Sequence, residues 1–233
     1  MSLILNIETA TEVCSVCFAK DGEVFAIKES FEGKTHAKLL TVFIEELLVE
    51  NNLKVADFDA IAVSMGPGSY TGLRIGVSAA KGLAYAANLP LIAVNTLQSI
   101  ALGLSTQKDI KINSNAWICP MIDARRMEVY TAFFNIKNEK ESKISADIID
   151  EKSYMDVLNE RQVLFCGNGS EKCKNSITHK NALFIDNIQC SARYMATLAE
   201  HAFLKSDFVD VAYFEPFYLK DFVATIPRKN IFK

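Results

Sequence analysis

The chain has 233 residues, of which 50% are hydrophobic and 23% are charged, and its formal net charge at pH 7 is −3. This length and composition exclude a disordered protein, and we expect two packed subdomains. The acidic balance argues against binding nucleic acid through the chain's own field, because phosphate contacts require a basic surface.

The sequence predicts a cytoplasmic protein. Residues 1–7 are apolar but carry no basic region and run directly into Glu8, unlike a secretory signal. A membrane helix needs roughly 20 apolar residues, and the longest candidate, residues 83–94, is interrupted by Asn88 and Pro90. Six cysteines, mostly in apolar stretches, are typical of reduced thiols in a reducing compartment.

The first part of the chain predicts a mixed sheet with helices on its faces. Strands are expected at residues 2–7, 13–20 and 23–31, and the Asp21-Gly22 turn is typical of a hairpin. Thr35 is a candidate N-cap for a helix that the apolar spacing extends to residue 50. The elements expected next are a strand at 60–64, a helix at 70–87, a strand at 91–94 and a helix at 96–104.

The second part resembles a reduced copy of the first. Residues 105–114 are polar and aperiodic, which places a junction between subdomains at 1–104 and 115–233. An aromatic segment at residues 213–226 is expected to wrap back over the core. The other predicted elements are strands at 116–123, 128–135, 142–149 and 163–166, and helices at 154–158 and 192–204.

The segment from Gly66 to Ala84 is the most informative stretch. Its loop, Gly66-Pro67-Gly68, turns into a helix rich in small residues, which predicts a close backbone approach. The neighbour is either a phosphate at the helix N-terminus or another helix, packed on Gly72, Gly76, Ala79 and Ala80. A Walker-type loop would need Gly-Lys-Ser/Thr where this chain has Gly-Leu-Arg, so we expect no nucleoside triphosphate in that loop.

Two carboxylates end corresponding strands of the two halves. Glu8, which precedes Thr9, either lies near a bound nucleotide and metal or merely caps its turn. Asp123, beside Arg125 and Arg126, is more typical of a structural ion pair than of an acid–base catalyst. The run Gly167-Asn168-Gly169-Ser170 could be a phosphate nest or a simple glycine turn.

Few residues suggest a nucleophile or a metal site. There is no Gly-x-Ser-x-Gly elbow, and the three histidines, His36, His179 and His201, share no helical face. Cys14 and Cys17 lie at odd spacing on a predicted strand, which sends their sulfurs to opposite faces and favours buried structural cysteines.

The helix at residues 35–50 carries more apolar side chains than one sheet-facing stripe can use. Either neighbouring helices of this chain cover the excess or another protein does.

Three segments resemble the TsaB (YeaZ) family, the non-catalytic subunit in bacterial synthesis of threonylcarbamoyladenosine on transfer RNA. They are Leu5-Asn6-Ile7-Glu8-Thr9-Ala10-Thr11, residues 66–84, and Pro120-Met121-Ile122-Asp123-Ala124-Arg125-Arg126 with Glu128-Val129-Tyr130. The resemblance covers most of residues 1–135 and, more loosely, residues 216–219. It implies an actin-like ATPase fold of the sugar kinase, Hsp70 and actin superfamily in two tandem subdomains.

The resemblance also implies partners. It implies a heterodimer with the catalytic TsaD-type subunit, a further TsaE-type small ATPase, and only indirect contact with transfer RNA; a homodimer is the alternative when the partner is absent. The implied docking residues are Leu39, Leu40, Phe43, Leu47, Tyr70, Gly72, Leu73, Arg74, Gly76, Val77 and Ala80. The other motif residues are Glu8, Thr9, Gly66, Pro67, Gly68, Asp123 and Arg125.

One comparison within the resemblance concerns catalysis. The catalytic paralogue carries a Val-Asn-His-x-x-x-His metal pattern, and Thr96 and Ile100 stand at the two histidine positions here. Because threonine is a poor transition-metal ligand and isoleucine is none, we expect no metal, no intrinsic activity and no cofactor bound by this chain alone. ATP or ADP at the interface of the complex stays open. The alternative is a small actin-like kinase or nucleotidase that uses Glu8 and Asp123.

Overall fold

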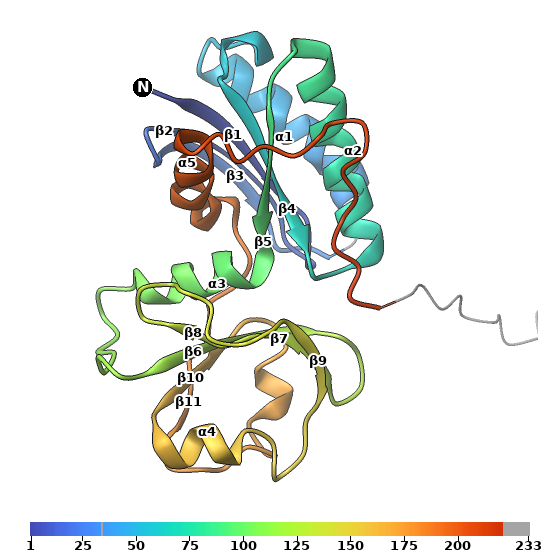
Figure 1. The fold of residues 1–233 in the computed structure, drawn as a ribbon. Helices are drawn as coiled ribbons and strands as arrows, with labels where there is room; N and C mark the ends of the chain where they lie inside the picture. The colour runs from blue at the N-terminus through green and yellow to red at the C-terminus, as the bar shows by residue number, and fades with distance from the viewer. Residues whose placement is uncertain (34, 221–233) are drawn as a thin grey trace, which may run out of the picture.

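The computed structural model describes residues 1–33 and 35–220, which form two lobes stacked end to end (Figure 1). The first lobe contains a five-stranded sheet in the order β3-β2-β1-β4-β5. The strands β1 to β3 are antiparallel, whereas β4 and β5 run parallel to β1, as predicted. Their bounds are Leu3–Glu8 (β1), Cys14–Lys20 (β2), Glu23–Ser30 (β3), Ala60–Gly66 (β4) and Leu91–Asn95 (β5).

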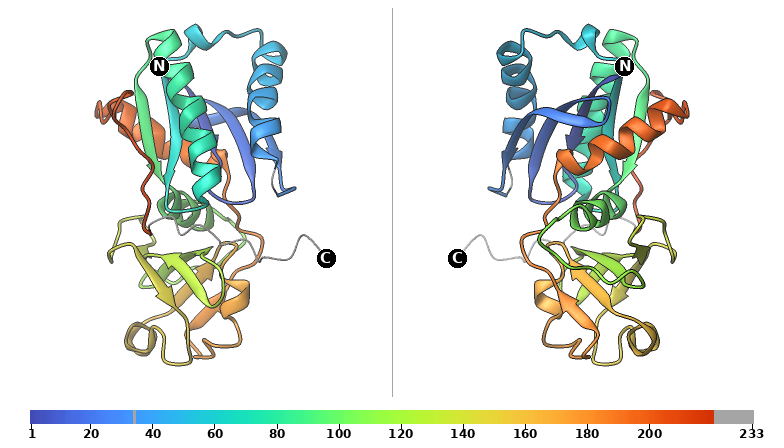
Figure 2. Two further views of the ribbon diagram at one scale, coloured as in Figure 1. Left: turned by 90° about the vertical axis from the view of Figure 1, so that its right-hand side faces the viewer. Right: turned by 90° about the vertical axis from the view of Figure 1, so that its left-hand side faces the viewer.

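Helices cover both faces of this sheet, as the two views of Figure 2 show. The helices α1 (His36–Glu50) and α2 (Tyr70–Ala87) pack on one face over a core that includes Leu5, Phe18 and Val63. A short 3₁₀ turn, η1 (Val55–Asp57), precedes β4. Thr35 precedes α1, but its side chain accepts no capping hydrogen bond; its hydroxyl donates to the Glu32 carbonyl at 2.8 Å.

The second lobe holds a sheet in the order β11-β10-β6-β7-β9, with β8 also paired to β6. The strands are β6 (Trp117–Asp123), β7 (Glu128–Thr131), β8 (Phe134–Asn135), β9 (Ser145–Ile148), β10 (Val163–Cys166) and β11 (Ala182–Phe184). A short helix, α4 (Met155–Glu160), and a 3₁₀ turn, η2 (Glu171–Cys173), complete it.

The strand predicted at residues 128–135 is two strands in the structure. Residues 128–131 and 134–135 pair with β6 in one continuous register, and the gap between them lies opposite Pro120. Proline has no backbone N–H to donate to the ladder, so the pairing breaks there. The Thr131 hydroxyl donates to the Pro120 carbonyl at 2.8 Å instead.

Each lobe is completed by a helical segment that follows the sheet of the other lobe in the sequence. The helix α3 (Thr96–Ser105) follows the first sheet but packs Leu97, Ile100 and Leu104 into the core of the second lobe. Conversely, the 3₁₀ turn η3 (Ala192–Met195) and helix α5 (Ala196–Leu204) follow the second sheet but pack on the first, against Ile4, Ala62 and Ile92. The predicted range 115–233 therefore contains segments that pack on both sheets.

The last described residues, 209–220, form what we call the C-terminal strap, which runs along the first lobe beside α2 (Figure 1). Val209 bridges to Leu91 at the edge of β5, and the Lys81 Nζ on α2 donates to the Ala212 and Phe214 carbonyls at 3.0 Å each. The Phe217 amide donates to the Met65 carbonyl at 2.7 Å. The predicted wrapping segment is thus confirmed as far as residue 220, and residues 221–226 lie outside the described part.

All six cysteines are unpaired thiols and buried, which confirms the expectation of packed cysteines. Burial raises the pKa of the Cys14 thiol to about 11, so it is protonated and unreactive at neutral pH. Within residues 1–33 and 35–220, no helix combines the length and the apolar character that crossing a bilayer requires.

Glu29 on β3 anchors η3 to the first sheet. Its carboxylate, whose side chain is only 12% exposed, accepts hydrogen bonds from Ser15 Oγ at 2.9 Å and from Ser191 Oγ, and pairs with Arg193 at 2.8 Å. Ser15 Oγ also accepts from the Ala192 amide at 2.9 Å. A largely buried acceptor with this many donors ties β2, β3 and η3 into one unit.

We predict that Glu29→Gln lowers the free energy of unfolding by about 1–3 kcal/mol, because a hydrogen bond to a charged group is lost and a buried donor is left mispaired. The control is Glu46→Gln, which removes an exposed ion pair with Lys28 and should cost less than about 1 kcal/mol. Urea denaturation of both variants measures the difference. Equal losses would contradict the anchoring role.

Candidate functional site

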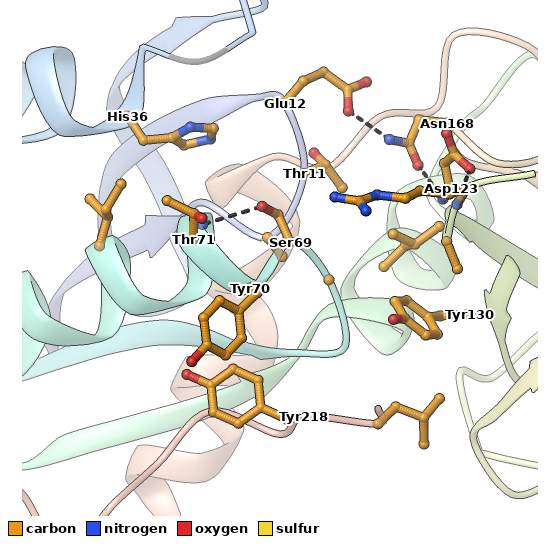
Figure 3. A pocket seen from close by; sticks show the side chains of 18 of the residues that line it. Thr11, Glu12, His36, Ser69, Tyr70, Thr71, Asp123, Tyr130, Asn168 and Tyr218 are labelled. Atoms are coloured by element: carbon orange, nitrogen blue, oxygen red, sulfur yellow. Dashed lines mark hydrogen bonds between the residues drawn. The ribbon is translucent and has the colours of Figure 1, made fainter. Parts of the chain in front are cut away.

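A cavity of about 840 Å³ lies between the two lobes. Figure 3 shows side chains entering it from the β1–β2 turn, the start of α2, the β6–β7 hairpin and the C-terminal strap. Tyr70 and Tyr218 form one aromatic wall, with ring centroids 5.1 Å apart, and Tyr130 lies on the opposite lobe. The Arg74 guanidinium stacks 4.2 Å over the Tyr70 ring and donates to the Tyr218 hydroxyl at 3.3 Å.

The close approach predicted for the small-residue helix is made by the chain itself. A Cβ at Gly72 would lie 2.1 Å from the Thr9 carbonyl oxygen, one at Gly76 would lie 2.2 Å from Thr9 Oγ1, and one at Gly68 would lie 2.3 Å from the Ala10 carbonyl oxygen. The neighbour of this face is therefore the β1–β2 turn, not a phosphate or another helix as expected from the sequence.

Hydrogen bonds fix the same contact. The Ser69 amide donates to the Ala10 carbonyl at 2.6 Å, and Thr9 Oγ1 donates to the Gly72 carbonyl at 2.8 Å. Ser69 caps α2 by accepting from the Gly72 amide at 3.2 Å. The turn thus engages the Ser69 amide and packs on the glycine face of α2, while Ser69, Tyr70 and Thr71 line the cavity.

Gly66, which precedes Pro67, has a φ of +106°, a conformation that side chains rarely adopt. A Cβ there would lie 2.8 Å from the Phe217 carbonyl oxygen of the strap. This glycine therefore lets the strap approach the loop that leads into α2.

Glu8 is fully buried and does not line the cavity. Its Oε1 accepts from the Ala10 amide at 2.6 Å. Burial raises the pKa of the Glu8 carboxyl from its ordinary 4.5 to about 7, against the lowering effect of hydrogen bonds from Ala10 and Ser64. The carboxyl therefore shapes the β1–β2 turn and does not reach a ligand in the cavity.

Asp123 lies at the rim of the cavity and is half exposed. Its carboxylate pairs with Lys172 Nζ and accepts from the Arg125 amide at 2.8 Å. An ion pair was expected, but its recorded partner is a lysine from η2 and not one of the adjacent arginines. Arg125 lines the cavity, and it and Arg126 both have positive φ at the tip of the β6–β7 hairpin.

The run Gly167-Asn168-Gly169-Ser170 forms a tight turn against β6. The Gly169 amide donates to the Met121 carbonyl at 2.9 Å, and the Ser170 amide donates to the Gly167 carbonyl at 3.1 Å. With two of its amides engaged, the turn is not an open phosphate nest. Asn168 reaches across to the first lobe, where its Nδ2 donates to Glu12 Oε2 at 2.6 Å. Sequence analysis did not select Glu12, because an exposed loop carboxylate carries no distinguishing pattern.

Thr96 and Ile100, which stand at the two histidine positions of the paralogue's metal pattern, are buried and packed in this structure. Thr96 is buried, and its Oγ1 accepts from the Gly66 amide at 3.1 Å, while Ile100 lies in the second core. Asn95 caps α3 by accepting from the Gln98 amide at 3.0 Å. His36 is buried with Nε2 3.1 Å from the Val13 carbonyl. Among the described residues, no group of three or more His, Cys, Asp or Glu side chains could hold a metal ion.

The predicted docking residues fall into two classes. Seven are buried within this chain, where they pack α1 and α2 on the sheet or on the β1–β2 turn: Leu40, Leu47, Gly72, Leu73, Gly76, Val77 and Ala80. Leu39, Phe43 and Tyr70 are partly exposed, and Arg74 is exposed. On α1, Val42 and Val49 are 39% and 75% exposed and extend this outer face. The outward-facing residues are the ones that a partner could touch directly.

Comparisons with known proteins agree on one family. The family model described as TsaD, tRNA N6-adenosine threonylcarbamoyltransferase, matches residues 30–228. The chain is 30% identical over 229 residues to the tRNA threonylcarbamoyladenosine biosynthesis protein TsaB of Haemophilus influenzae, covering 94% of this chain and 93% of that protein. It is 32% identical over 230 residues to the Escherichia coli protein of the same name, covering 95% and 96%.

Solved structures place the fold. YeaZ from Pseudomonas aeruginosa has a TM-score of 0.79 at 25% identity, covering 94% of this chain and 100% of that one. The activator of 2-hydroxyisocaproyl-CoA dehydratase from Clostridium difficile, solved with bound ADPNP, has a TM-score of 0.50 at 9% identity, covering 88% and 96%. These likenesses confirm the actin-like fold class.

We predict that Gly72→Ala destabilises the protein by about 1–3 kcal/mol, because the added methyl group must displace the Thr9 carbonyl. Gly82 provides a control on the same helix, since a Cβ there meets nothing within 4 Å. Gly82→Ala should therefore stabilise by about 0.5–1 kcal/mol. Thermal and urea unfolding measure both. A loss for Gly82→Ala equal to that for Gly72→Ala would show that the turn contact is not the cause.

Glu8 predicts a specific pH dependence. The pKa of Glu8 is raised on folding. The difference in free energy of unfolding between the wild type and Glu8→Gln should therefore stay constant up to about pH 4.5. The wild type should then lose about 3 kcal/mol relative to that variant as the pH rises to about 7, and no more above that. Urea titrations of both proteins between pH 4 and 8 measure this difference. A difference that does not change with pH would mean that the carboxyl keeps its ordinary pKa.

Proposed function

The chain belongs to the TsaB family, and on this premise we propose that it is a non-catalytic subunit in the synthesis of threonylcarbamoyladenosine on transfer RNA. In this role it pairs with the catalytic TsaD-type subunit and stabilises it. That subunit then transfers the threonylcarbamoyl group to the adenosine next to the anticodon.

The replacement of the histidine pair carries the non-catalytic part of this proposal. Thr96 and Ile100 are both buried and committed to the fold, so neither could be recruited as a ligand by a small movement. The family model that matches residues 30–228 bears the name of the transferase, whereas the curated relatives over most of the chain bear the name TsaB. A chain that retains the fold without the metal ligands is suited to docking and not to transfer.

A small kinase or nucleotidase is the competing function, because the cavity between the lobes is large enough for a nucleoside. In that function, Glu8 and Asp123 would have to reach a nucleotide and its metal ion. The burial of Glu8 argues against it, since only Asp123 of that pair reaches the cavity and it is already paired with Lys172. ATP turnover by the purified chain that is lost in Glu8→Gln would favour this function over ours.

The outer face of α1 and α2 supports the docking part. On α1, Val42 and Val49 are exposed, and Leu39 and Phe43 are partly exposed while packing against the first core. Arg74 is exposed on α2. Exposed apolar side chains of this kind form a surface that a helical partner can bury.

Several finer points belong to the same proposal. We expect a TsaE-type small ATPase to join the complex, and transfer RNA to be bound by the partners, since this chain has a net charge of −3. Any ATP or ADP would lie at the interface of the complex and not in this chain alone. The chain would work in the cytoplasm, and without its partner it would form a homodimer through the same helices.

We predict that Val42→Asp and Phe43→Asp each weaken binding to the TsaD-type subunit at least about tenfold, because a carboxylate would be desolvated in an apolar interface. Titration calorimetry with the purified subunits measures the affinity. The matched control is Ile148→Asp, which places the same charge on a residue of the second lobe that is 75% exposed.

The cellular readout is the threonylcarbamoyladenosine content of transfer RNA in cells depleted of this protein and supplied with each variant. Wild type and Ile148→Asp should restore the modification, whereas Val42→Asp should not. Full binding and full modification with both α1 variants would refute the docking surface. An unchanged modification level after depletion would refute the proposed function as a whole.

A further inference from the structure

The side chain of Asn168, in the second lobe, forms a hydrogen bond with the β1–β2 turn of the first lobe. In Figure 3 it lies between Glu12 and Asp123 at the edge of the cavity. Its Nδ2 donates to Glu12 Oε2 at 2.6 Å, and its Oδ1 accepts from the Asp123 amide at 3.1 Å. One carboxamide therefore uses both of its ends, one toward each lobe.

The second-lobe end of this bridge is rigid. Asn168 stands between Gly167, whose φ is +92°, and Gly169, where a Cβ would lie 2.8 Å from the Ile122 carbonyl carbon. The Gly169 amide is bonded to the Met121 carbonyl. The turn is thus pressed on the end of β6, and the direction of the Asn168 side chain is set by the sheet.

The first-lobe end leads to α2. Glu12 follows Thr9 and Ala10, the residues on which Gly68, Gly72 and Gly76 are packed. The Ser69 amide and Thr9 Oγ1 close this contact with hydrogen bonds of 2.6 and 2.8 Å. A displacement of Glu12 would therefore be transmitted to the start of α2, because no space separates the turn from the helix.

A second contact joins the lobes at the other rim of the cavity. Lys220 of the C-terminal strap pairs with Glu128 on β7. The strap is held on α2 through Lys81 and through Tyr218 beside Arg74. The start of α2 is consequently linked to the second lobe on both sides of the cavity.

From these contacts we infer that Asn168 is a positioning residue: its bridge between Glu12 and Asp123 holds the two lobes closed on the turn that sets α2. The bridge consists of the protein's own side chains, so closure needs no ligand in the cavity. The docking face on α2 is then ordered before a partner arrives, which lowers the cost of binding. This last step rests on the proposed function, whereas the closure of the lobes does not.

The test exchanges the roles of donor and acceptor. In Asn168→Asp, one carboxylate oxygen still accepts from the Asp123 amide, but the other faces the Glu12 carboxylate and repels it. In Glu12→Gln/Asn168→Asp, the new glutamine amide can donate to the new aspartate, which restores the bridge with reversed polarity. Rescue by a second substitution separates a specific bridge from a general packing defect.

Hydrogen–deuterium exchange on the full-length free chain measures closure at the amides of residues 9–12 and 69–73. We expect exchange there to be about tenfold faster in Asn168→Asp, the effect of losing one charge-assisted hydrogen bond. We expect it to return to within about twofold of wild type in the double variant. Asn175→Asp, the same change at an exposed asparagine of the second lobe, should match wild type.

Affinity for the TsaD-type subunit is the second readout. It should fall in Asn168→Asp and recover in Glu12→Gln/Asn168→Asp. Thermal unfolding checks that each variant is folded. Wild-type exchange in Asn168→Asp, or a double variant no better than the single one, would overturn the bridge. If exchange follows the expected order and affinity stays constant, the lobes are closed by Asn168 but the link to docking is wrong. Loss of binding in Val42→Asp tests the docking surface independently of both.

Discussion

The contact between the β1–β2 turn and the glycine face of α2 determines how the rest of the molecule is arranged. The Cβ of any other residue at position 72 would lie only 2.1 Å from the Thr9 carbonyl oxygen, which is closer than the two atoms can approach. Only a helix with glycine at that position can come this close. The approach brings the Ser69 amide onto the Ala10 carbonyl and leaves Arg74, on the opposite side of the helix, exposed. This one contact thus fixes which side of α2 is buried and which side faces outward.

Local patterns predicted the first lobe well because its elements carry strong periodic signals. The bounds of α2 agree with the prediction, and those of β4 and β5 differ by one or two residues. The second lobe was harder to predict. Its strands are short, β11 has only three residues, and the break opposite Pro120 depends on a partner strand that the local pattern does not show. The superfamily itself came from the resemblance of motifs and not from periodicity.

Long-range relations account for what sequence reasoning missed at the site. The glycines of α2 predicted a close neighbour, but nothing in residues 66–84 identifies that neighbour as Thr9. Helical spacing on α1 likewise shows an apolar excess without separating its faces. In the structure Leu40, Ile44 and Leu47 enter the core, while Val42 and Val49 stay outside. The bridge from Asn168 to Glu12 joins residues 156 apart in the chain, and neither belongs to a periodic pattern.

The carboxylates near the cavity are engaged by the protein itself, as the β1–β2 turn and α2 are engaged with each other. Glu8 is withdrawn into the core, Asp123 is paired with Lys172, and Glu12 accepts from Asn168. The two of these acids that line the cavity, Asp123 and Glu12, are thus paired with side chains of the protein, and Glu8 does not reach it. A cleft of this kind keeps its volume but gains little electrostatic energy from a guest, since binding would first have to break existing pairs. The stability of the two-lobed frame then comes from the helices α3 and α5, the strap and the inter-lobe bridges. A frame that is closed by its own contacts can present α1 and α2 without a ligand in the cavity, which is what the proposed docking role requires.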